Sequence, residues 1–210
     1  MREFDDIVQR LRQHFGTVTV QPPAGEAALH DLLQRVPAVP DVLLSFWRYC
    51  DGVRATRYED GDLFGIQRAL SSYPLGGDAQ RLSRLVPLRG DGCGDYDCLV
   101  GGGGPCEGAM VFWDHEVSDG AAYLLGGSFL SYLDMWADHM VQEYLPSGER
   151  DPRCRPPKLD AWPWLGTPEY EHPWPFDESW MRGRDPVAAR LLGDESSRRW
   201  LLKQDDLTEA

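Results

Sequence analysis

Apolar side chains recur every three or four positions in four parts of the chain, which predicts four amphipathic helices. In the first part, Phe4, Ile7 and Leu11 fall on one face. Ser128 precedes the last part and offers a hydroxyl that can cap its first turn. Asp51-Gly52 ends the third, because glycine readily adopts the left-handed backbone of a helix end. The predicted helices cover residues 3–15, 26–36, 41–50 and 128–144.

Short apolar runs separated by glycine and aspartate replace this spacing between residues 53 and 125, a pattern typical of strands. The links between the later runs are short, so consecutive strands are expected to pair antiparallel as a meander. Residues 71–85 have a mixed pattern, which we interpret as a broken helix. The predicted strands cover residues 54–58, 63–66, 85–89, 96–100, 109–114 and 121–125.

Helices that precede and follow a sheet predict an α+β fold, here over residues 1–145, with a mostly antiparallel sheet and a helix packed on one face. Residues 146–210 differ in composition, because they hold nine of the 16 prolines and five of the eight tryptophans. We interpret them as an extension that wraps the domain, with residues 150–182 extended across its surface. Asp185-Pro186 predicts a helix start. Short helices are expected at 187–192 and 196–202.

The formal net charge of −13 and the pI of about 4.7 restrict the partners of the chain. Phosphate backbones and anionic membrane surfaces repel such a chain, so neither a nucleic acid nor a membrane is expected to bind it. A basic protein is favoured, because attraction at long range raises its association rate. Solubility alone is an equally good reason for the charge.

Cytoplasmic localisation is expected from two features. No apolar run reaches the roughly 18 to 20 residues that span a bilayer, and Glu3, Asp5 and Asp6 occupy a region where a secretory signal needs basic residues. Five cysteines are an odd number, which argues against a disulfide framework in a reducing compartment.

A stretch of alternating acids and glycines, residues 89–98, is the most distinctive part of the sequence. Asp91, Asp95 and Asp97 have the oxygen ligands that calcium prefers, but their spacing does not match the helix–loop–helix calcium motif. The favoured interpretation is a tight connection between two strands, in which glycine permits positive φ and aspartate bonds to the local backbone.

Two further groups of residues have catalytic or metal-binding alternatives. Cys93, Cys98, Cys106 and His115 could bind zinc, but paired Cys-x-x-Cys knuckles are missing, so buried thiols are the favoured interpretation. Asp114-His115-Glu116 combines acids with a base. Strand alternation is expected to point His115 away from both acids, which favours a structural or interface role over catalysis.

Four short motifs together have a characteristic order along the chain: Val36-Pro37 to Gly52, Gly90–Tyr96, Val111–Glu116 and Ala122–Leu133. They resemble motifs of the SUKH superfamily, which contains the fungal Smi/Knr-type regulators of cell-wall synthesis and many bacterial immunity proteins. The resemblance covers about residues 1–145. It implies an α+β domain with a mostly antiparallel sheet, no known cofactor and no shared catalytic set. It also implies that a bacterial member neutralises a secreted toxin by direct binding.

These observations together predict a non-catalytic, protein-binding domain without a cofactor, most consistent with an immunity protein that occludes a basic toxin domain. A scaffold or regulator of cell-wall synthesis or signalling is the first alternative. A metal-dependent hydrolase that uses Asp91, Asp95, Asp97 and His115 is the second. Trp162 and Trp164 either pack onto the domain or dock a partner. The predicted protein-binding residues are Asp91, Asp95, Tyr96, Asp97, Asp114, Glu116, Trp162 and Trp164.

Overall fold

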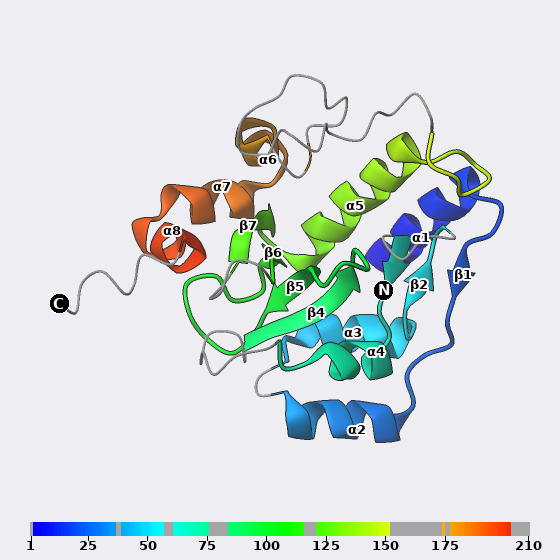
Figure 1. Cartoon of the computed structure of the whole chain (residues 1–210), viewed down its shortest axis with the longest axis horizontal. Helices are drawn as coiled ribbons and strands as arrows, with labels where there is room; N and C mark the ends of the chain where they lie inside the picture. Colours follow the sequence, from blue (N-terminus) through cyan, green and yellow to red (C-terminus); the bar gives the residue numbers. More distant parts are fainter. Residues whose placement is uncertain are drawn as a thin grey trace.

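A computed structural model gives the chain an α+β fold with two antiparallel sheets, as predicted (Figure 1). The fold combines eight helices with seven strands in the part of the chain that the structure describes. That part consists of residues 2–36, 39–56, 61–75, 84–115, 121–151, 174 and 177–202.

The larger sheet is a four-stranded antiparallel meander in the order β4-β5-β6-β7, which confirms the predicted pairing. Nearly every described side chain of the two inner strands β5 and β6 is buried or partly buried, because protein covers both faces of the sheet. The strands cover Leu85–Gly90 (β4), Tyr96–Val100 (β5), Met110–Trp113 (β6) and Ala121–Gly126 (β7).

A small three-stranded sheet flanks the edge strand β4. It consists of β1 (Thr19–Val20), β2 (Val53–Arg54) and β3 (Asp62–Leu63). The predicted strand pair is therefore shorter than expected, and β1 was not predicted. The amide of Phe64 donates to the carbonyl of Leu88 at 2.7 Å, so this sheet is joined to β4 by backbone hydrogen bonding.

The four helices predicted from spacing are confirmed: α1 (Arg2–His14), α2 (Glu26–Arg35), α3 (Asp41–Tyr49) and α5 (Phe129–Glu143). Ser128 and Ser131 form a reciprocal capping box at the start of α5. Of the broken helix predicted for 71–85, residues 71–72 are helical as the end of α4 (Ile66–Ser72), whereas residues 73–75 are not helical and β4 begins at Leu85. Residues 76–83 lie outside the described part. None of the described helices is both long and apolar enough to cross a bilayer.

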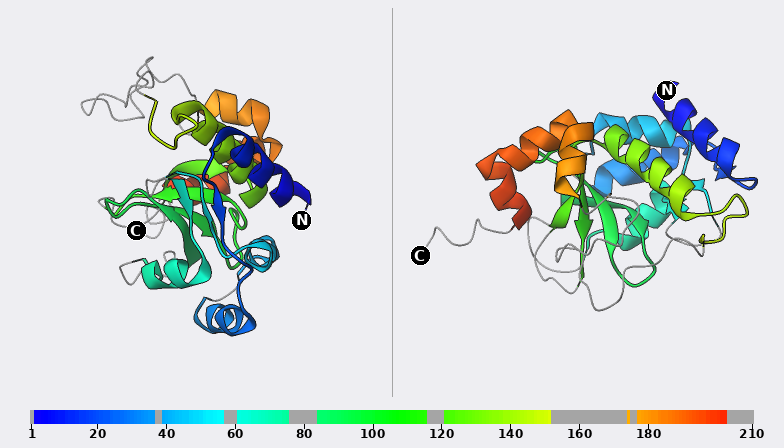
Figure 2. Two further views of the ribbon diagram at one scale, coloured as in Figure 1. Left: turned by 90° about the vertical axis from the view of Figure 1, so that its right-hand side faces the viewer. Right: turned by 90° about the horizontal axis from the view of Figure 1, so that it is seen from above.

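Helix α5 lies on one face of the larger sheet, with α1 beside it (Figures 1 and 2). Phe129 of α5 packs edge-on against Phe46 of α3, with ring centroids 5.3 Å apart, and Phe4 of α1 packs against both rings. Aromatic side chains thereby fix three helices of the domain around one point of the core.

Ion pairs connect α5 to helices on both of its sides. Asp134 and Asp138 lie one turn apart on α5, and both pair with Arg10 of α1 and with Arg184 of α6 (Glu178–Arg184). Burial alone raises the pKa of Asp134, but the hydrogen bonds from Arg184 and Arg10 outweigh it and hold that pKa below its usual value of 3.8. The carboxylate therefore stays ionised at neutral pH and the cross-link between the helices persists.

The C-terminal helices pack against the edge strand β7 and the start of α5 (Figure 1). They are α6, α7 (Pro186–Gly193) and α8 (Glu195–Leu202). The prediction of extended chain through residue 182 is wrong for 178–182, which belong to α6, while 152–173 and 175–176 lie outside the described residues. Trp174 is buried, and its Nε1 donates to the carbonyl of Leu125 at 2.8 Å.

Asp185 joins these helices to the rest of the domain. Its Oδ1 accepts hydrogen bonds from Val187 and Ala188 and so caps α7, as predicted. Its Oδ2 accepts from the amide of Gly127 at 2.7 Å and from the hydroxyl of Ser131 at 2.6 Å. One buried carboxylate therefore caps one helix and anchors it to the start of another.

Replacing Asp185 with alanine is expected to lower the free energy of unfolding by about 2–4 kcal/mol, because a cap and two buried hydrogen bonds to a charge are lost together. Asp194→Ala is the matched control, since the Asp194 side chain caps α8 through Ser197 and, among the described residues, bonds only to the first turn of that helix. Urea denaturation of both variants measures the difference. Equal losses would contradict the anchoring role of Asp185.

Candidate functional site

The connection between β4 and β5 is a tight turn built by Asp91 and two glycines. Gly92 and Gly94 have φ angles of 83° and 114°, which a side chain disfavours. Oδ1 of Asp91 accepts hydrogen bonds from the amides of Cys93, at 2.7 Å, and Asp95, at 3.2 Å. These contacts confirm the predicted tight connection. They direct the Asp91 carboxylate at its own backbone, as in an Asx turn.

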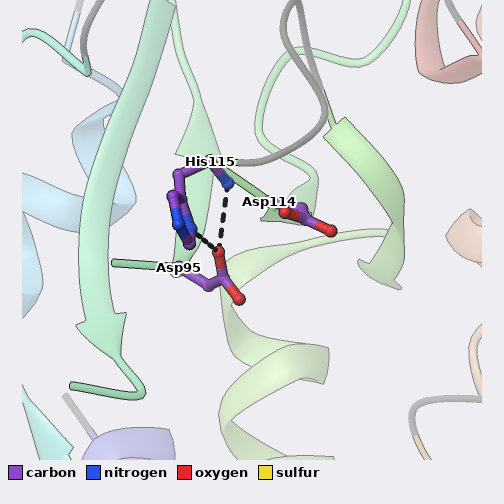
Figure 3. Close-up of side chains that lie close together, drawn as sticks. All are labelled: Asp95, Asp114 and His115. Carbon is purple, nitrogen blue, oxygen red and sulfur yellow. Dashed lines mark hydrogen bonds and ion pairs between the residues drawn. The ribbon is translucent and has the colours of Figure 1, made fainter. Parts of the chain in front are cut away.

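The turn brings Asp95 against the end of β6 (Figure 3). Oδ1 of Asp95 accepts from the backbone amide of His115 at 3.0 Å and from the ring Nδ1 of His115 at 2.7 Å. A Cβ atom on Gly94 would lie 3.2 Å from that same nitrogen, so a glycine is needed for this close approach. The side chain of His115 is 44% exposed and that of Asp95 is 18% exposed.

Asp114 completes a cluster with this pair. One ligand atom from each of Asp95, Asp114 and His115 lies within 4.8 Å of the other two. The prediction that His115 points away from Asp114 is wrong, because β6 ends at Trp113 and strand alternation no longer governs the two residues that follow. Asp114 is only 7% exposed, so it lies beneath the surface that Asp95 and His115 present.

Tyr96 supports the turn with its ring and remains partly exposed. It stacks on Trp113 of β6 with ring centroids 6.1 Å apart, and it meets Phe64 edge-on at 6.3 Å. The backbone at the start of β5 is therefore held by aromatic packing as well as by strand pairing. Four predicted residues, Asp91, Asp95, Tyr96 and Asp114, thus lie close together around the turn.

Asp97 does not belong to this surface, which corrects the prediction that it contacts a partner. It is 1% exposed. Its Oδ2 accepts from Nε of Arg89, at 2.6 Å, and from the hydroxyl of Tyr132 on α5, also at 2.6 Å. Burial first, and then the Asp97 charge, raise the pKa of Tyr132 well above its usual value, so Tyr132 remains a donor. Asp97 therefore links the sheet to α5 inside the core.

The residues of the disfavoured zinc alternative do not come together, because no three of Cys93, Cys98, Cys106 and His115 lie within ligand distance of one another. Cys98 and Cys106 are buried, and Cys93 is exposed on the turn. Asp95, Asp114 and His115 are the described residues with the arrangement of a metal ligand set. An ion there would have to displace the hydrogen bond between His115 Nδ1 and Asp95, because ligand atoms must be free of protons.

Three predicted binding residues, Glu116, Trp162 and Trp164, lie outside the described residues. A pocket of about 120 Å³ beside β2 and β3, lined by both charged and apolar residues, was not predicted. In it, Asp62 pairs with Arg54 at 3.2 Å and with Arg68 at 3.6 Å. The acid and the bases belong to three separate elements, and no local spacing in the sequence indicates that they meet.

Comparison of the whole chain with protein-family models and with curated proteins gives no match.

Replacing Asp97 with asparagine is expected to lower the free energy of unfolding by about 3–5 kcal/mol, because the ion pair with Arg89 at a largely buried site is lost. Tyr132→Phe is the matched control and is expected to cost about 1–3 kcal/mol, since it removes one hydrogen bond and no charge. Chemical denaturation measures both. A variant Asp97→Asn as stable as the parent would show that the carboxylate is solvated.

Thiol labelling is expected to separate the described cysteines. Burial raises the pKa of Cys50 to about 11 and that of Cys98 well above its usual value, which keeps both as unreactive thiols. Cys93 is exposed on the turn and is expected to react first with iodoacetamide in the native protein. Peptide mass spectrometry measures the order, and faster labelling of Cys98 than of Cys93 would contradict the arrangement.

Proposed function

We propose that the chain is a non-catalytic protein-binding domain that recognises a basic surface of another protein through the turn between β4 and β5. The observation that carries this proposal is the ordered acidic surface formed by Asp91, Asp95 and His115. Each carboxylate is fixed by hydrogen bonds to the backbone of the turn or to His115. A surface that is ordered before association loses less entropy when a partner binds.

Charge supports a basic partner. The net charge of −13 creates long-range attraction for a basic protein, and Asp91 and Asp95 contribute two of the negative charges at one end of the sheet. The hydrogen bonds of Asp91 and Asp95 at the turn all involve Oδ1, and within the described part of the chain the second oxygen of each carboxylate, Oδ2, accepts none. Lysine or arginine side chains of a partner can approach these oxygens from solvent.

The resemblance to the SUKH superfamily extends the proposal to a partner class. We propose an immunity protein that acts in the cytoplasm and covers the basic working surface of a toxin domain. A scaffold or regulator of cell-wall synthesis or signalling is the rival within the same resemblance. A neighbouring gene for a toxin-bearing secreted protein favours immunity, and its absence favours regulation.

A metal-dependent hydrolase is favoured by one observation, the cluster of Asp95, Asp114 and His115. The contacts of Asp91 and Asp97 argue against the larger ligand set, because Asp91 bonds to its own turn and Asp97 bonds to Arg89 and Tyr132. Elemental analysis of the purified chain tests this alternative, and a stoichiometric metal would favour it over the binding proposal.

The binding proposal is tested with the double variant Asp91→Asn, Asp95→Asn. Asparagine keeps an oxygen acceptor at both positions and removes both charges, so the turn is expected to stay folded. With a partner captured from the native cell by the tagged full chain, association is expected to be roughly three to ten times slower at low salt. Stopped-flow fluorescence measures the rate.

The double variant Asp194→Asn, Glu195→Gln is the matched control. It removes two negative charges from the start of α8, which lies near Cys106 at the opposite end of β5 from the turn. Its effect on the rate is expected to be smaller than that of the turn variant. If both variants associated with the partner equally slowly, net charge alone would explain the slower association. That result would contradict recognition by the turn.

A further inference from the structure

A groove of about 540 Å³ lies between α1 and α5, away from the β4–β5 turn. The two helices lie side by side in Figure 1 and in the two views of Figure 2. A volume of this size accommodates several side chains of a bound segment. The residues that line the groove are Glu3, Asp6, Ile7 and Arg10 of α1 and Leu130, Ser131 and Asp134 of α5.

Each of the two helices contributes one apolar residue to the lining of the groove, Ile7 from α1 and Leu130 from α5. Aromatic side chains pack the same two helices together. Phe4 of α1 and Phe129 of α5 have ring centroids 6.4 Å apart, and both pack on Phe46. These contacts hold the helices at a fixed separation, so the groove exists before a ligand binds and costs little ordering.

The rim of the groove is acidic. Arg10 is the basic residue of the lining, and its guanidinium already pairs with Asp134 and Asp138. Arg184 pairs with the same two carboxylates, so two positive and two negative charges cancel at this end. Within the described part of the chain, Glu3 and Asp6 take part in no ion pair, and both side chains are exposed. No cation of the described residues therefore pairs with these two negative charges of the rim.

We infer that this groove binds a basic segment of another protein, which inserts an aliphatic side chain between Ile7 and Leu130 and places lysine or arginine against Glu3 and Asp6. Charge complementarity selects this occupant, because an acidic or neutral segment would leave both carboxylates to lose water without gaining a partner. The inference does not depend on the function proposed for the turn, since the two surfaces share no residue.

A peptide titration of the ¹⁵N-labelled full chain tests the inference. The probe is a synthetic helical peptide with two leucines one turn apart, flanked by arginines, and the matched peptide has glutamate in place of each arginine. The arginine peptide is expected to shift the amide resonances of Ile7, Leu130 and Ser131. Equal binding of the glutamate peptide, or shifts centred on residues 91–95, would overturn the inference.

Variants of α1 sharpen the test. Glu3→Gln with Asp6→Asn is expected to weaken binding of the arginine peptide about threefold to tenfold. Asp5→Asn is the matched control, because Asp5 lies in the same turn of α1 but accepts a hydrogen bond from Tyr49, at 2.8 Å, instead of lining the groove. It is expected to leave the affinity within about twofold of the parent.

Three further outcomes would overturn the inference. One is an equal loss of affinity for each charge removed in Asp5→Asn and in the double variant, which would mean that net charge alone attracts the peptide. Another is no shift at the highest soluble peptide concentration. A third is that the same amide resonances shift when the protein concentration is raised without peptide. That result would mean that a second copy of the chain occupies the groove. The variant Asp91→Asn, Asp95→Asn is expected to bind the peptide like the parent, which separates this groove from the turn.

Discussion

The carboxylate of Asp97 is buried between β5 and α5, and the position of the acidic turn depends on how that charge is compensated. A charge in the interior costs several kcal/mol unless a partner and hydrogen bonds accompany it. Arg89 supplies the charge and Tyr132 the hydroxyl, both at 2.6 Å. Arg89 precedes Gly90, the last residue of β4, so the turn begins directly after this ion pair, and Asp91 and Asp95 lie at one defined place beside it.

The acids of residues 91–97 serve three different purposes as a result. Asp97 stabilises the core, Asp91 holds its own turn, and Asp95 binds His115. On the other side of the domain, Asp134 and Asp138 connect α1 and α6 through two arginines. The lowered pKa of Asp134 means that its stabilising contribution is complete above pH 3.8 and is lost as the pH falls through the lowered value. Acidic residues therefore hold this fold together at neutral pH as well as providing its charge.

Local patterns in the sequence predicted the elements that depend on local contacts. The apolar spacing of α1 and α5, the caps Ser128 and Asp185 and the meander β4 to β7 belong to this group. Helix α4 was not predicted. The amide of Ile66 in its first turn donates a hydrogen bond to the side chain of Asp51 at 2.7 Å. The start of α4 therefore depends on a residue outside the helix, which local spacing does not indicate. Strand β1 has only two residues, too few for a periodic pattern.

The site was predictable in its location but not in the role of each residue. The alternation of acids and glycines indicated the turn, and Asp91 and Asp95 lie there. The burial of Asp97 could not be predicted, because β5 is covered on both faces and its partner Tyr132 is 35 residues away. The position of His115 beside Asp114 depends on where β6 ends, which short strands leave uncertain in sequence.

Hydrogen–deuterium exchange of the full chain, free and with the protein captured from its native cell, tests the central claim most directly. Recognition through the turn predicts slower exchange on binding for the amides of residues 90–96 and for His115. Exchange in α8, at the opposite end of β5, is predicted to stay unchanged. Unaltered exchange in the turn, with protection confined to other elements, would contradict the account.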